Sequence, residues 1–186
     1  MKNNFLNCID SRLEILKRLK NIDFYIKDLI ENACSVIKDK KKFFFCGNGG
    51  SAAESIHLNA EMIGKFKLLR RPVSSICLNT DIAVITALSN DFGFENLFIR
   101  QIEALANEGD MIFFLTTSGK SKNIIKALKF AKKNKLITTT LCGKYTKSLK
   151  NYSDHIISID SFDTAIIQEM HLFIGHYICE QIEKNL

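Results

Sequence analysis

The sequence predicts an α/β fold in which a doubly wound parallel sheet lies between two layers of helices. Apolar runs of strand length alternate with segments of helical period along the chain, a pattern typical of strands joined by crossover helices. The run at 111–115 (MIFFL) contains no polar residue, as expected of a strand buried on both faces of a parallel sheet. A chain of 186 residues has the length of one domain,. We therefore expect a single three-layer domain over residues 1–186.

Two helices are expected before the first strand. Apolar residues recur at helical spacing over residues 3–20 and again over residues 22–37,. We expect an N-terminal helical hairpin outside the main sheet, with residues 1–40 used for packing between subunits. Packing against the protein's own core would explain the pattern equally well.

The remaining strands and helices alternate regularly. Strands are expected at 43–46, 72–78, 111–115, 136–142 and 155–159,. Helices are expected from Ser51, from the cap at Asp81 to Leu88, and at 94–106, 123–133 and 164–182,. A polar turn is expected at 89–93 and a basic loop at 144–150,. The last helix is apolar nearly all round, which indicates burial against the sheet or a partner subunit.

Composition argues against a membrane protein and favours a cytoplasmic one. No run of about 18 apolar residues is present, and the N-terminus lacks the apolar core of a signal peptide,. Six scattered cysteines without a CxxC pair are typical of reduced thiols,. The net charge of +6 fits a lysine-rich proteome or an anionic ligand, either a sugar phosphate or nucleic acid,. The lysine runs at 38–42 and 129–135 indicate solvated faces, so nucleic acid is not the expected partner.

A glycine-rich turn follows the strand expected at 43–46 and precedes a helix. Such a turn lets backbone N–H groups approach an anion closely, and the helix N-terminus adds partial positive charge. Gly47, Gly49 and Ala52 also fit the dinucleotide fingerprint,. That fingerprint requires an acidic residue about 20 residues further on, where residues 65–71 are basic. The sequence therefore favours a phosphate site and argues against NAD.

A second polar turn, rich in hydroxyls, follows the strand at 111–115. Residues 118–121 (SGKS) look like the end of a Walker A loop, but the glycine that the motif requires at 114 is phenylalanine,. The hydroxyls and main-chain amides of this turn could still bind a phosphate monoester. An ordinary Ser/Thr turn with a helix cap is the alternative. Both turns are expected at the ligand-binding edge of the sheet.

Histidine and acidic residues recur on two of the expected helices. His57 and Glu61 share one helix face and could bind a metal, act as an acid–base pair, or form a surface pair. The last helix places four polar residues in an apolar segment: Gln168, Glu169, His171 and His176. Gln168 and His176 are about 12 Å apart along the helix axis. They could bind one ion only if it lay midway between them, unless they came from different subunits.

Four stretches together resemble the phosphoheptose isomerases (sedoheptulose 7-phosphate isomerases), enzymes of the flavodoxin-like SIS fold. They are residues 46–66, 78–101, 109–128 and 166–183. The resemblance implies an aldose–ketose isomerase that interconverts sedoheptulose 7-phosphate and D-glycero-D-manno-heptose 7-phosphate through an enediol. It also implies a cytoplasmic homotetramer in heptose biosynthesis for lipopolysaccharide or capsule, with active sites at subunit interfaces.

The resemblance further implies roles for individual residues. Glu61 and His176 would be the catalytic acid–base pair. One zinc ion per site would be held by His57, Glu61, Gln168 and His176. The substrate would be bound by Asn48, Gly49, Gly50, Ser51, Glu61, Asn90, Asp91, Thr116, Thr117, Ser118, Ser121 and Gln168.

Some positions depart from the family pattern, which leaves the exact substrate open. Ile166 stands where an arginine is usual, and the basic loop 144–150 replaces a glycine pair. One alternative is a non-catalytic SIS adaptor resembling the DnaA initiator-associating protein. Such adaptors lack the glutamate and the final histidine, which are present here as Glu61 and His176. A second alternative is a sugar-phosphate sensor that keeps the phosphate turn without turnover.

Overall fold

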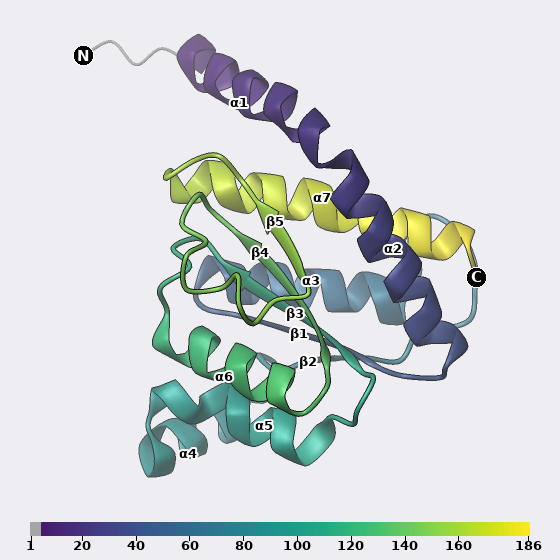
Figure 1. The fold of residues 1–186 in the computed structure, drawn as a ribbon, viewed down its shortest axis with the longest axis vertical. Helices are drawn as coiled ribbons and strands as arrows, with labels where there is room; N and C mark the ends of the chain where they lie inside the picture. The colour runs from purple at the N-terminus through teal and green to yellow at the C-terminus, as the bar shows by residue number, and fades with distance from the viewer. Residues whose placement is uncertain (1–4) are drawn as a thin grey trace.

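The computed structural model describes residues 5–186 and shows a five-stranded, fully parallel sheet in the order β2-β1-β3-β4-β5 (Figure 1). The strands are β1 (Phe43–Gly47), β2 (Ser75–Cys77), β3 (Met111–Thr116), β4 (Ile137–Cys142) and β5 (His155–Ser158). The predicted α/β fold is confirmed. Strand order reverses between β1 and β3, and ligands bind doubly wound sheets at such a switch point.

Helices cover both faces of the sheet. One face carries α2 (Asp23–Lys38), α3 (Gly50–Ile63) and α7 (Thr164–Lys184), and the other carries α4 (Ile82–Phe92), α5 (Leu97–Leu105) and α6 (Lys122–Lys133) (Figure 1). Successive side chains of β1 pack into opposite cores: Phe43 and Phe45 contribute to one hydrophobic cluster and Phe44 to the other. Burial on both faces explains why β1 and β3 are uninterrupted apolar runs.

The predicted N-terminal hairpin is wrong, because α1 (Phe5–Leu19) and α2 run end to end (Figure 1). Residues 3 and 4 of the expected first helix lie outside the described residues. No glycine or proline separates Leu19 from Asp23. A 3-10 turn, Lys20–Ile22, joins the two helices, and the chain continues in the same general direction (Figure 1). Arg12 holds α1 to α7 through a bidentate ion pair with Glu169.

Two further boundaries differ from the prediction. The segment expected as a polar turn at 89–93 is the last part of α4, which ends at Phe92 before Gly93 adopts a φ of +81°. The side chains of Asn90 and Asp91 are exposed to solvent, so they do not interrupt the helix. β2 is only three residues long, shorter than the expected 72–78. The loop at 144–150 contains turns but no helix or strand.

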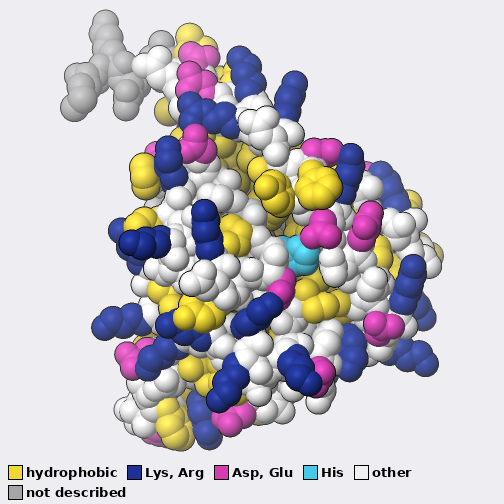
Figure 2. Space-filling model, viewed as in Figure 1, with side chains coloured by type: hydrophobic (Ala, Val, Ile, Leu, Met, Phe, Trp, Pro, Cys, Tyr) yellow, Lys and Arg dark blue, Asp and Glu magenta, His cyan; other side chains and the backbone are white. Residues whose placement is uncertain are grey.

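Charge is mixed on one face of the molecule. Figure 2 shows Lys and Arg side chains spread over one face and interspersed with Asp and Glu. Such a surface differs from the continuous basic stripe that tracks a nucleic-acid backbone. Among residues 5–186, no helix has both the length and the apolar composition needed to cross a membrane.

Candidate active site

The two polar turns meet at the switch point of the sheet. Gly47 at the end of β1 pairs with Leu115 in β3, so the turns that follow these strands are neighbours. The side-chain amides of Asn48 and Asn123 exchange two hydrogen bonds of 2.8 Å and join the first turn to the start of α6. Asn123 is buried and was not expected to be functional. An asparagine just after a hydroxyl-rich turn was the only sequence signal for it.

The glycine turn is shaped by close contacts. Gly49 has a φ of +56°, a conformation that favours glycine. A Cβ on Gly50 would lie 2.2 Å from Nε2 of Gln168, so glycine at this position lets the end of the Gln168 side chain lie directly against the turn. Asn79, also missed in the sequence, donates to the Gly47 carbonyl and accepts from its N–H, both at 3.0 Å. These contacts fix the turn and leave Gly49 and Gly50 exposed.

The hydroxyl turn uses some of its groups internally. Thr116 is buried and accepts from the Gly119 N–H at 3.3 Å, and Ser118 accepts from the Lys120 N–H at 3.2 Å. Ser121 immediately precedes α6, a helix of 12 residues whose N-terminal N–H groups favour an anion,. The groove beside this end has a volume of about 490 Å³ and is lined by Asn48, Phe92, Gly93, Phe94, Glu95, Ser121, Lys122 and Asn123.

Asn90 and Asp91 lie on the last turn of α4, directly before the groove-lining residue Phe92. Both are exposed, and Asn90 Nδ2 donates to Asp91 Oδ1 at 2.8 Å. The adjacent Phe92 lines the groove together with Asn48. The structure thus brings together Asn48, Ser121 and the end of α4.

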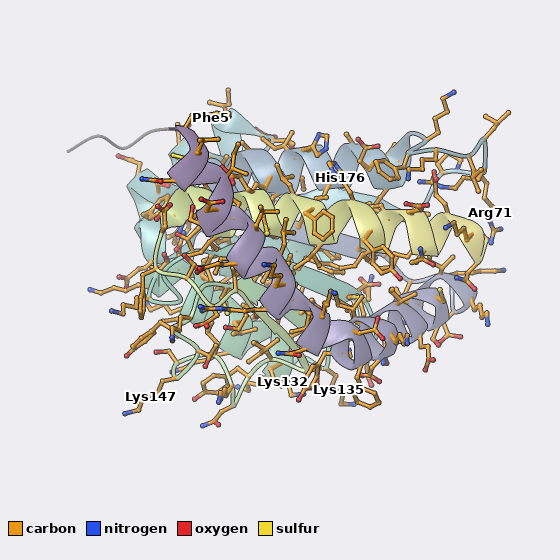
Figure 3. The ribbon with its side chains drawn as sticks, turned by 90° about the horizontal axis from the view of Figure 1, so that it is seen from above. Phe5, Arg71, Lys132, Lys135, Lys147 and His176 are labelled. Atoms are coloured by element: carbon orange, nitrogen blue, oxygen red, sulfur yellow. The ribbon has the colours of Figure 1, made fainter. Side chains whose placement is uncertain are left out.

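A second polar group lies farther along α3, where it faces α7. His57 Nε2 is 2.7 Å from His176 Nε2 and 3.5 Å from Glu61 Oε1. One ligand atom from each of the three residues lies within 4.8 Å of the other two. Figure 3 shows His176 on α7 beside α3. The helices can come this close because residue 175 is glycine. A Cβ at this position would lie 2.6 Å from Leu58 Cδ2, too close for a larger residue.

The environment of His176 favours the neutral form of its imidazole. Partial burial lowers the pKa of His176, and the neighbouring His57 lowers it further, while Glu61 opposes both. A neutral imidazole can bind a metal or exchange a proton near pH 7. Two imidazoles and a carboxylate are ligands that Zn²⁺ takes in proteins, so the donor set fits a zinc ion,.

Gln168 lies apart from this cluster. It contacts Gly50, seven residues and about 10 Å of helix rise before His57. Its expected role as a fourth zinc ligand stays a prediction, while its place beside the glycine turn fits substrate contact.

A buried pair lies between the same helices. Glu54 and His171 are 5% and 0% exposed, and Oε1 of Glu54 is 3.9 Å from Nδ1 of His171. Ser51 and the Cys142 backbone interact with the pair, but neither contact has hydrogen-bond geometry. Burial raises the pKa of Glu54 to about 7 and lowers the pKa of His171 to about 4. Both groups are therefore largely neutral at pH 6.

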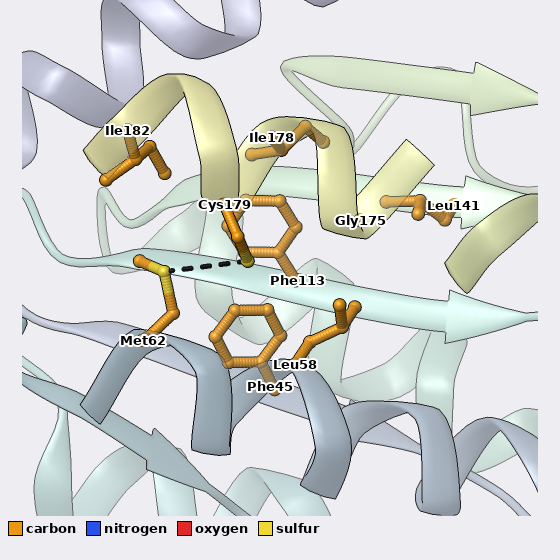
Figure 4. A pocket seen from close by; sticks show the side chains of 9 residues that line it. All are labelled: Phe45, Leu58, Met62, Phe113, Leu141, Gly175, Ile178, Cys179 and Ile182. Atoms are coloured by element: carbon orange, nitrogen blue, oxygen red, sulfur yellow. Dashed lines mark hydrogen bonds between the residues drawn. The ribbon is translucent and has the colours of Figure 1, made fainter. Parts of the chain in front are cut away.

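The apolar pocket beneath α3 and α7 is not a ligand site. Its lining includes Phe45, Leu58, Phe113 and Ile178, and Cys179 Sγ lies 4.0 Å from Met62 Sδ (Figure 4). Its volume of about 10 Å³ is close to that of a single water probe. It is a small packing gap in the core.

Comparisons with known proteins agree with this geometry. The SIS domain model matches residues 8–143. The chain is 44% identical to the phosphoheptose isomerase of a Nitratiruptor species over 149 residues. These aligned residues cover 80% of each protein. It is 36% identical to that of Akkermansia muciniphila over 100% of this chain and 96% of the relative. The structure of a phosphoheptose isomerase from Francisella tularensis matches with a TM-score of 0.92 and 30% identity, over 97% of this chain and 96% of that chain. The chain therefore belongs to the SIS domain family and, within it, to the phosphoheptose isomerases.

Proposed function

We propose that this protein is a phosphoheptose isomerase that interconverts sedoheptulose 7-phosphate and D-glycero-D-manno-heptose 7-phosphate. The observation that carries the proposal is the cluster of His57, Glu61 and His176 on the helix that begins at the glycine turn and on the helix that faces it. An acid–base centre close to an anion cradle is what a sugar-phosphate isomerase requires.

The reaction moves two protons. One leaves C1 of the ketose and arrives at C2, and another passes from the oxygen on C1 to the oxygen on C2, through an enediol. We assign the carbon-bound proton to the carboxylate of Glu61 and the oxygen-bound proton to the imidazole of His176. Oε1 of Glu61 lies 3.5 Å from Nε2 of His57, and neither carboxylate oxygen makes a hydrogen bond among the described residues. Oε2 is therefore available as the base.

Zinc fits the same three residues. His57 would bind through Nε2 and Glu61 through Oε1, and Nε2 of His176, which faces them, could be a third ligand. A nitrogen bound to zinc cannot also exchange a proton, so Nε2 of His176 would serve either the ion or the proton transfer at a given moment. A bound zinc ion would act as a Lewis acid towards the oxygens of the first two sugar carbons. His57 would thus serve the ion, and Oε2 of Glu61 would remain free for proton transfer.

The phosphate end of the substrate would lie at the switch point. The glycine turn and the hydroxyls of Thr117, Ser118 and Ser121 offer donors there, and the N-terminus of α6 adds positive potential,. The cluster at His57 is about 10 Å along α3 from Gly50. An open-chain heptose phosphate can extend along α3 between the two, past Gln168, while Asn90 and Asp91 contact the sugar.

A homotetramer with active sites at its interfaces is supported by apolar surface that one chain leaves open. None of the residues that the structure describes in α4 is buried, and Ile82 is 75% exposed. Apolar side chains of α1 are exposed as well (Phe5, Leu6, Ile9 and Leu13), as are Phe173 and Tyr177 beside His176. Figure 2 shows hydrophobic side chains reaching the surface in several places. Exposed apolar surface of this extent favours self-association. Six free cysteines fit a cytoplasmic location,.

The decisive experiment measures conversion of the sugar phosphate. Purified protein is incubated with sedoheptulose 7-phosphate, and the aldose product is measured by NMR. Formation of the aldose supports the isomerase. Binding of the sugar phosphate without conversion would identify a sensor, and neither binding nor conversion would favour the adaptor.

A further inference from the structure

The loop that follows α3 places an aromatic ring against the candidate acid–base centre. The ring of Phe66 stacks on the imidazole of His176, with centroids 5.2 Å apart and 15° between the planes. The ring of His57 meets His176 edge-on, at 5.0 Å and 77°. The imidazole of His176 is thus held by two rings, and its rotation would disrupt both contacts.

A buried carboxylate anchors the backbone of this loop. Glu183, near the end of α7, is 4% exposed. Its two oxygens accept from three consecutive backbone N–H groups, those of Phe66 at 2.7 Å, Lys67 at 2.8 Å and Leu68 at 3.1 Å. Hydrogen bonds to an ionised acceptor are stronger than neutral ones. The position of the Phe66 backbone is therefore set by α7, the helix that also carries His176.

Arg70 joins the same contacts to the end of α3. Its Nε lies 3.2 Å from Glu183 Oε1, with both side chains almost fully buried. Its other nitrogens donate to four backbone carbonyls, those of Glu61, Met62, Gly64 and Arg71. A cation at a helix C-terminus is stabilising. The turn of α3 that carries Glu61, the loop and the end of α7 thus form one connected unit.

We propose that Phe66 is a positioning residue for His176 and that Glu183 and Arg70 hold it in place. Phe66 does not contact the reacting atoms. It fixes the plane of the imidazole so that Nε2 of His176 points at His57 and Glu61. The predicted effect on kcat rests on the proposed isomerase function. The geometry of the three ligand atoms can be tested without turnover, through zinc affinity.

The test compares Phe66→Leu, which keeps apolar bulk without a ring, with Phe66→Tyr, which keeps the ring. Leu69→Ala is the matched control, because Leu69 is in the same loop and 93% exposed. In Phe66→Leu we expect zinc affinity to fall about 10-fold or more. We also expect kcat to fall about 10-fold, with KM within about 2-fold of wild type because substrate binding is retained. Phe66→Tyr should restore both values, and Leu69→Ala should match wild type.

Zinc affinity, from competition with a chromophoric chelator, and steady-state kinetics are measured on the same samples, with circular dichroism to check folding. Wild-type zinc affinity and kcat in Phe66→Leu would overturn the positioning role and leave the isomerase function standing. A wild-type protein that binds zinc without turnover would remove the function, and the zinc affinities would still decide the role of Phe66. A wild-type protein with neither property would overturn both.

A second arm tests the anchor. Glu183→Gln keeps the shape but replaces one carboxylate oxygen by a donor, so one backbone N–H loses its acceptor. Zinc affinity and kcat should fall in the same direction as in Phe66→Leu, but less. If Glu183→Gln folds and both values stay at wild-type levels, Glu183 has no part in positioning.

Discussion

Two histidine–glutamate centres lie between α3 and α7, and they differ mainly in their access to solvent. His57, Glu61 and His176 are half-buried or exposed and face one another through nitrogen and oxygen atoms. Glu54 and His171 are buried and have no hydrogen-bond partner among the described residues. Glu54 precedes His57 by one helical turn. The same residue types on the same helices are thus placed in opposite environments.

Solvent access determines what each centre can do. A charged group is costly to bury without partners, so the buried pair is held neutral and cannot exchange protons with a substrate. The exposed cluster can gain and lose protons, and a substrate or an ion can reach it. Burial, more than residue type, therefore separates the candidate catalytic centre from a pair that belongs to the packing of the two helices.

The largest expected effect comes from changing the matched glutamates. Glu61→Gln should lower kcat by about 10²-fold or more, because it removes the proposed base. Glu54→Gln should change kcat far less, because its side chain is shielded from the substrate. Steady-state kinetics with sedoheptulose 7-phosphate measure both, and circular dichroism checks the folds. Equal losses in the two variants would remove the distinction between the centres.

Zinc affinity should depend on the exposed centre and not on the buried pair. His57→Asn should lower zinc affinity by about 100-fold, since one of three nearby ligands is lost. His171→Asn should leave zinc affinity within about 3-fold of wild type, because burial keeps this ring away from the ion. Isothermal titration of apoprotein with zinc gives both affinities. A large loss in His171→Asn would show that the buried ring takes part in binding.

The buried pair should be visible in the pH dependence of stability. The folded pKa of Glu54 is about 7, above its ordinary 4.5, so the stability that it contributes is present below pH 4.5 and is lost as pH rises through 7. The folded pKa of His171 is about 4, below its ordinary 6.5, so its contribution is present above pH 6.5 and is lost as pH falls through 4. The two dependences oppose each other between pH 4.5 and 6.5.

Replacing one member of the pair should remove that member's contribution to the pH dependence of stability. Relative to wild type, Glu54→Gln should gain stability as pH rises from 4.5 to 7, and His171→Asn should gain stability as pH falls from 6.5 to 4. Each change is about 3 kcal/mol in the free energy of unfolding, measured by urea denaturation across this pH range. Curves that run parallel to wild type in both variants would contradict the assigned burial.

The sequence predicts the sheet and the residue types of the site, but not their environments. The alternating apolar runs identify every strand, and the spacing of His57 and Glu61 places them on one helix face. Which histidine of α7 is buried depends on how that helix is rotated against α3, where Gly175 faces Leu58. Such a contact between distant segments leaves no periodic signal. The same holds for Asn79 and Asn123, whose amides act only once the turns are folded together.

The smallest expected effect is a loss of stability on removing the N-terminal cap of α7, the helix that contributes a histidine to both centres. Asp163 caps α7 by accepting from the N–H groups of Ala165 at 2.9 Å and Ile166 at 3.2 Å. Asp163→Ala should lower the free energy of unfolding by about 1 kcal/mol, because two helix N–H groups lose their acceptor. The cap is more than two turns from His171 and His176, so the pH dependence and the zinc affinity should stay at their wild-type values while stability falls. A shift in either would mean that fraying of α7 propagates to the centres, and the comparison between them would then require corrections for the stability of the helix.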